Sequence, residues 1–123
     1  WPAAVSQGTI AAANAVAAAG APLQAYAPAA PVTTLKVAGI DLTTIGRFEA
    51  SGSDEVTVAL AEEQTNKYRK LVIAGGQIAG AILLGYPEEA AGVTEAVRQK
   101  LDVLNQLPAL RAGDWSGLRK LVD

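Results

Sequence analysis

Acidic residues occur in adjacent pairs at three places in this sequence. Paired carboxylates could act in acid and base catalysis or bind a metal ion. The pairs are Asp54 with Glu55, Glu62 with Glu63, and Glu88 with Glu89. Neighbouring residues point to different faces of a strand or helix, so the carboxylates of one pair do not converge on a single atom. The pattern favours solvated surface charge and charge at a helix end over a catalytic dyad.

Two residue types that carry much of enzyme chemistry are missing, because the chain has no cysteine and no histidine. Their absence excludes disulfides, thiolate nucleophiles, iron–sulfur ligation, most zinc sites and every Ser–His triad. We therefore expect no catalytic residue and no metal ligand, and a chain that does not catalyse a reaction by itself.

A glycine-containing segment, Leu71 to Gly80, has some likeness to the phosphate-binding turn of a dinucleotide-binding βαβ unit. That turn needs glycines at its first, third and sixth positions, and the third position counted from Gly75 is Gln77. Adjacent glycines at Gly75 and Gly76 favour the primed turns that join antiparallel strands. The segment therefore predicts a β-hairpin.

A short basic run, formed by Lys67, Arg69 and Lys70 around Tyr68, could contact a phosphate or a partner. The alternative, which we favour, is that these charges protect an edge strand against pairing with another chain. The net charge of −2, with 18% charged residues, gives no basic surface for nucleic acid or anionic lipid. The longest apolar stretch, 74–84, is too short and too interrupted to span a membrane.

The first quarter of the chain is predicted to form an arm. Residues 3–19 are nearly all good helix formers, with Pro2 suited to a helix start and Gly20 to a helix end. Residues 20–31 contain three prolines among alanines and predict an extended linker. The composition changes to β-branched residues at Thr33, so we place the boundary between an arm, 1–32, and a compact core, 33–123.

The core predicts strands first and helices afterwards. Short strands are expected at 33–38 and 40–45 around a bend at Gly39, then at 54–61, 67–73 and 78–84. A helix is expected to begin at Pro87, with apolar residues at helical spacing as far as Leu104. Pro108 is expected to end this helical region, and Asp114 can cap a last short helix. Strands grouped before helices indicate an α+β fold: an antiparallel sheet of about five strands followed by packed helices, with an N-terminal Ala-rich helical arm.

The start of the arm is the one place where backbone chemistry could bind a ligand. The first amides of a helix are free and carry partial positive charge, so they can hold an anionic or electron-rich atom, and Trp1 could cover a flat ring beside them. By spacing alone, a Trp at the edge of an Ala-rich helix is more commonly a packing residue.

The arm and the core together resemble a known family. The segments that carry the resemblance are Trp1-Pro2-Ala3-Ala4-Val5-Ser6-Gln7-Gly8 with Ala11-Ala12-Ala13-Asn14, then residues 35–42, Gly46, residues 68–73 and residues 78–85. In this order they are similar to the end of the FAD-binding domain and the C-terminal domain of FAD-dependent NAD(P)H oxidoreductases. The branch is that of the nitrite reductase large subunits and the rubredoxin reductase-like enzymes.

The resemblance implies that the two parts of this chain belong to different domains of a longer, cytoplasmic enzyme. Residues 1–32 would be the last helix of the FAD-binding domain with its linker, and residues 33–123 the C-terminal interface domain. Trp1, Ala3 and Ala4 would lie near the isoalloxazine ring of FAD, with backbone amides stabilising negative charge on the reduced flavin. The implied partners are the FAD- and NAD(P)-binding domains of the same enzyme, and a redox partner protein or a second copy.

A second hypothesis needs no flavin. The lack of catalytic side chains and the apolar Ala-rich arm also fit an interaction or oligomerisation module. The proline linker permits the arm to contact its own core or a neighbouring copy.

Overall fold

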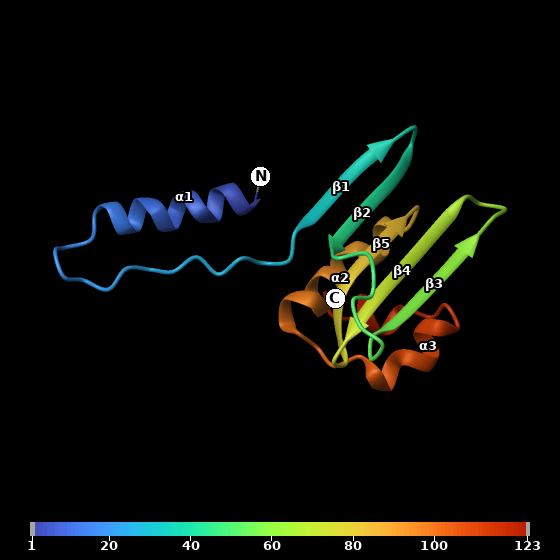
Figure 1. Ribbon diagram of the computed structural model, residues 1–123. Helices are drawn as coiled ribbons and strands as arrows, with labels where there is room; N and C mark the ends of the chain where they lie inside the picture. Colours follow the sequence, from blue (N-terminus) through green and yellow to red (C-terminus); the bar gives the residue numbers. More distant parts are fainter. Residues whose placement is uncertain (1, 123) are drawn as a thin grey trace.

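Two tight turns organise the sheet in the computed structural model, which describes residues 2–122 (Figure 1). Strands β4 (Lys67–Ala74) and β5 (Gln77–Leu84) are joined through Gly75 and Gly76, whose φ angles of 55° and 81° are those of a primed turn. The predicted hairpin is confirmed. The same turn geometry joins β1 (Val32–Val37) to β2 (Ile40–Gly46), where a bend was expected, with positive φ at Ala38 and Gly39.

The five strands form one antiparallel sheet in the order β1-β2-β5-β4-β3, with β3 at Val56–Glu62. Strand β4 therefore lies inside the sheet, between β5 and β3. The interpretation of its basic residues as guards of a free edge is wrong, because β4 has no free edge.

A long connection crosses the sheet from β2 to β3. Because β2 pairs with β5 while β3 lies at the far edge, residues 47–55 must pass over β5 and β4, and Figure 1 shows this loop crossing the ribbon. The crossing touches the sheet at Gly80: a Cβ on Gly80 would lie 1.6 Å from the carbonyl oxygen of Arg47. Only glycine permits this approach.

Replacing Gly80 by alanine is expected to lower the free energy of unfolding by about 1–3 kcal/mol, because the crossing loop has to shift away from β5. Urea denaturation of the two proteins measures the difference. The matched control is Gly75→Ala, where a Cβ meets no atom within 4 Å and only the turn conformation is penalised. Equal stability of Gly80→Ala and the unsubstituted chain would contradict the close crossing.

The helices cover the other face of the sheet. Helix α2 (Pro87–Gln99) packs on β5 and β2, α4 (Ser116–Arg119) packs on α2, and α3 (Leu107–Arg111) with the 3₁₀ turn η1 (Leu104–Gln106) lies toward β3. Side chains from both layers form one buried core, among them Ile45, Leu71, Ile73, Leu83, Val93, Leu110, Trp115 and Leu118. The predicted α+β architecture, with strands before helices, is confirmed.

Three predicted details of the helical region change. Helix α2 ends at Gln99 rather than continuing to Leu104, because Lys100 adopts a left-handed conformation with φ 52°. Pro108 lies in the first turn of α3 instead of closing the region, a position where its missing N–H costs nothing. The Asp114 carboxylate accepts a hydrogen bond from the Ser116 N–H, as a cap would, although Trp115 is the residue at the cap position.

The arm extends away from the sheet (Figure 1). Its helix α1 (Pro2–Ala15) ends four residues before the predicted end at residue 19, and residues 16–31 form no helix or strand. The side chain of Asn14 donates to the carbonyl of Gln24 and accepts from its N–H, at 2.9 and 2.8 Å, so the linker folds back along the helix. Among the helices of residues 2–122, none has the length and hydrophobicity of a transmembrane segment.

Candidate functional site

The predicted ligand-binding end of the arm is exposed to solvent. Ala3 and Ala4 lie in the first turn of α1, both side chains are exposed, and that turn carries no acidic residue. Trp1, the third predicted residue, lies outside the described residues. The free amides and small side chains of this turn leave room for a flat ligand to approach the helix end.

The paired carboxylates do not converge. In the described part of the chain, no group of three or more Asp, Glu, His or Cys residues could hold a metal ion. Glu63 and Glu88 are exposed, as predicted, but Glu89 is buried, with only 3% of its surface accessible, so for Glu89 the prediction of a solvated charge is wrong.

Glu55 holds the crossing loop in place. It forms a bidentate ion pair with Arg47, one bond of which measures 2.7 Å, and it accepts the Ser51 N–H at 2.7 Å. The hydrogen bonds from Arg47 and then from Ser51 lower the pKa of Glu55 to about 2. The pair joins the start and the end of the loop, which is a structural role.

Arg69 is the centre of a buried cluster that sequence reasoning did not anticipate. Its guanidinium lies over the rings of Tyr86 and Trp115, 4.6 and 4.7 Å from their centroids. It donates to Glu89 Oε1 at 3.1 Å and to the Gly113 carbonyl at 2.6 Å. One side chain on β4 thus connects the sheet to α2 and to the segment that precedes α4.

Burial determines the electrostatics of this cluster. Burial is the largest influence on Glu89 and raises its pKa, while Arg119 and Arg69 oppose the effect. The Tyr86 hydroxyl donates to Glu62 Oε1 at 2.6 Å, a bond that lowers the pKa of Glu62. Two atoms of the cluster, Arg69 Nε and Glu89 Oε2, are buried without a hydrogen-bond partner. The remaining polar contacts join the sheet to the helical layer and fix their packing.

The sequence did contain a signal for this cluster. Arg69 has the same strand parity as Leu71 and Ile73, both of which are in the core, so alternation places it on the buried face. Glu89 precedes the buried Val93 by four residues, which places both on one face of α2.

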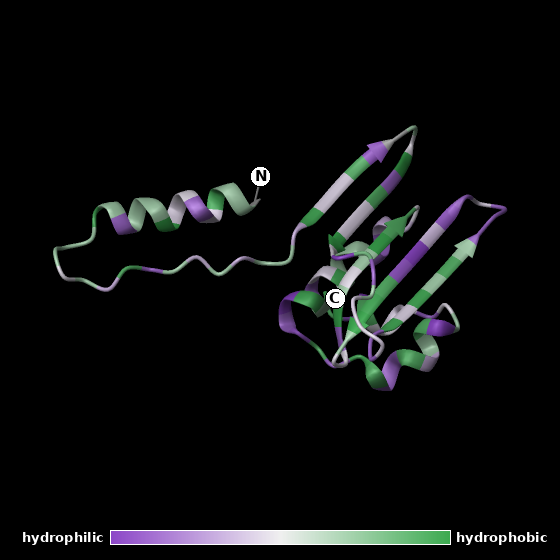
Figure 2. Cartoon of the chain, in the orientation of Figure 1, coloured by the Kyte–Doolittle hydropathy of each residue, from purple (hydrophilic) through white to green (hydrophobic). Residues whose placement is uncertain are grey.

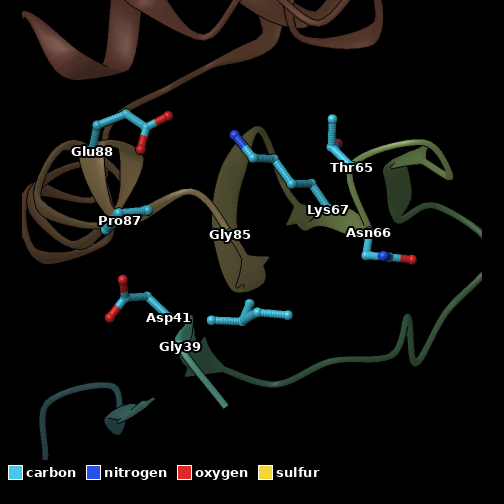
Figure 3. A pocket seen from close by; sticks show the side chains of 9 residues that line it. Gly39, Asp41, Thr65, Asn66, Lys67, Gly85, Pro87 and Glu88 are labelled. Atoms are coloured by element: carbon cyan, nitrogen blue, oxygen red, sulfur yellow. The ribbon is translucent and has the colours of Figure 1, made fainter. Parts of the chain in front are cut away.

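A shallow depression of about 370 Å³ lies where three connections meet (Figure 3). Asp41 and Gly39 come from the β1–β2 hairpin, Asn66 from the β3–β4 turn, Lys67 from the start of β4, and Glu88 from the start of α2. The Lys67 ammonium lies 5.1 Å from the centroid of the Tyr86 ring, and Asp41 pairs with Lys36 at 3.6 Å. The depression holds a mixture of charges and no group of side chains that would act together on a substrate.

The chain has measurable similarity to known reductases. Residues 31–101 match the family model of the rubredoxin NAD+ reductase C-terminal domain. A nitrite reductase [NAD(P)H] of Bacillus subtilis is 31% identical over 71 residues, which cover 58% of this chain and 9% of that protein. The assimilatory nitrate reductase electron transfer subunit of the same organism is 29% identical over 86 residues, which cover 68% of this chain and 11% of that protein. The chain thus aligns with about a tenth of the length of these relatives.

Proposed function

The chain belongs to the family of rubredoxin NAD+ reductase C-terminal domains, and from that premise we propose that it is the C-terminal part of a flavin-dependent NAD(P)H oxidoreductase. In this proposal the parent enzyme uses FAD to take hydride from NAD(P)H and passes electrons to a redox partner. The chain itself is not catalytic and serves as an interface on the FAD-binding domain. The family match over 31–101 is the observation that carries the proposal, and the names of the two relatives agree with it.

The arm supplies the proposed contact with the cofactor. Helix α1 would be the last helix of the FAD-binding domain, with Trp1, Ala3 and Ala4 beside the isoalloxazine ring. Ala3 and Ala4 suit this position, because their side chains are exposed and small, and the first turn of α1 has free amides and no acid. Bound FAD would supply the hydride chemistry, while these amides stabilise negative charge that develops at the ring.

A charge placed at that helix end tests the cofactor contact. In the longer natural polypeptide, Ala3→Glu is expected to disfavour the reduced flavin by about 2- to 30-fold in the equilibrium constant for reduction, since a carboxylate opposes the helix dipole. Titration of the flavin absorbance with a reference dye measures the shift. The control is Ala12→Glu, an exposed position near the other end of the same helix. Equal shifts in the two variants would contradict the contact.

The identity of the natural product tests the function as a whole. Intact mass and absorbance of the product purified from its source cells are expected to reveal a polypeptide several times longer than this chain, with bound flavin and NAD(P)H oxidation. A free-standing product without flavin would overturn the proposal and favour the interaction module, to which the exposed arm is also suited.

A further inference from the structure

One side chain of α1 holds the linker against the helix. The Asn14 amide donates to the Gln24 carbonyl at 2.9 Å, and its oxygen accepts the Gln24 N–H at 2.8 Å. One amide thus satisfies both backbone groups of Gln24, as a neighbouring strand would. We call these two hydrogen bonds the Asn14 clasp.

The composition of the arm leaves few other ways to hold this shape. Residues 1–32 contain no charged side chain, and Figure 2 shows the arm as mostly apolar or weakly polar. Among residues 3–15, the half-buried positions are Ile10, Ala13 and Asn14, which recur at the spacing of one helix face. Tyr26 is the only side chain of residues 16–31 that is not exposed. The linker therefore lies along this face of α1, and the clasp fixes its register.

The other end of the linker is attached to the sheet. The Pro31 carbonyl accepts the Gly46 N–H at 2.9 Å, one residue before β1 begins at Val32. Between the two attachments, residues 25–30 make no hydrogen bond within the described part of the chain. With the clasp closed, the joint between the arm and the sheet is therefore the six residues 25–30.

Opening the clasp would lengthen this joint. The linker would then be free from the end of α1, and the joint would comprise the 15 residues 16–30. At about 3.1 Å per extended residue, its greatest reach would rise from about 19 Å to about 46 Å. The effective concentration of the sheet near α1 falls roughly as the −3/2 power of the joint length, which gives a decrease of about fourfold.

We propose that Asn14 is a positioning residue, whose clasp shortens the joint and keeps the sheet close to α1. This role needs no flavin, because both partners of the clasp lie in the arm. In the enzyme proposed above, α1 belongs to the FAD-binding domain, so the same clasp would limit how far the core moves from that domain. That consequence, unlike the clasp itself, rests on the proposed function.

Distances between two spin labels test the clasp in the chain itself. The chain has no cysteine, so Ala12→Cys on α1 and Glu63→Cys in the β3–β4 turn, both at exposed positions, can be labelled uniquely. When Asn14→Ala is added, we expect the distance distribution from pulsed electron paramagnetic resonance to extend further by at least about 10 Å, because the joint is longer. Exchange of the Gln24 amide hydrogen should become faster by about tenfold or more.

Gln7→Ala is the matched control, since Gln7 is an exposed amide on the same helix and takes no part in the clasp. Alanine favours the helix more than asparagine does, so loss of α1 cannot explain longer distances in Asn14→Ala. Equal distributions with and without Asn14→Ala would overturn the proposal, as would an equal change in Gln7→Ala. Neither result touches the proposed function, which fails separately when the natural product contains no flavin.

Discussion

Replacing Arg69 by methionine is expected to lower the free energy of unfolding by about 3–5 kcal/mol. Methionine occupies a similar volume but leaves the Glu89 carboxylate buried without its ion-pair partner, and an uncompensated buried charge has a cost of this size. It also removes the hydrogen bond to the Gly113 carbonyl. Guanidinium denaturation monitored by far-UV circular dichroism measures the loss.

The dependence on pH separates the charge effect from lost packing. With its cation removed, Glu89 has a folded-state pKa further above its unfolded value, so the folded state binds the proton more tightly. Stability of the variant therefore rises, relative to the unsubstituted chain, as the pH falls from neutral through that folded-state pKa. Adding Glu89→Gln to Arg69→Met should restore most of the loss at neutral pH. A double variant no more stable than Arg69→Met would show that the buried charge is not the cause.

Replacing Trp115 by alanine is expected to cost a similar amount, about 3–5 kcal/mol, because a large and fully buried ring leaves a cavity between the sheet and the C-terminal segment. The substitution also leaves the Leu110 carbonyl without the indole N–H that donates to it at 2.9 Å. Thermal unfolding measures the change. Trp115→Phe keeps a ring over Arg69 and should cost less than Trp115→Ala.

The two substitutions are not independent, since the Arg69 guanidinium lies against the Trp115 ring. A double-mutant cycle between Arg69→Met and Trp115→Ala is expected to give a coupling of about 0.5–3 kcal/mol. Strict additivity would mean that the stack contributes nothing beyond the burial of each side chain.

The predictable parts of this fold are those with local signals. The Gly75-Gly76 turn and the run of strands before helices depend on neighbouring residues, and both predictions are confirmed. The position of β4 inside the sheet depends on which strands pair with each other across long stretches of sequence. No local sequence pattern indicates this pairing. For this reason the charges of β4 were interpreted as edge protection, although Arg69 is buried.

The site was predictable only in part for the same reason. The first turn of α1 has a local signature, and its role toward FAD stays a prediction. The cluster around Arg69 joins residues separated by up to 46 positions, from Arg69 to Trp115, and the family match ends at residue 101, before Trp115. Strand parity alone could indicate that Arg69 is buried, but not which partners meet it.

The single pairing between β2 and β5 has a consequence for how the molecule opens. Strand β1 pairs only with β2, and β2 reaches the rest of the sheet through β5, while β3, β4 and β5 form a continuous meander. The sheet therefore consists of two units, the β1–β2 hairpin and the β3–β4–β5 meander, which are joined by the pairing of β2 with β5. Hydrogen exchange at the amides of β1 and β2 should proceed as one cooperative opening, separate from the slower meander, and that opening would carry the arm away together with the first hairpin.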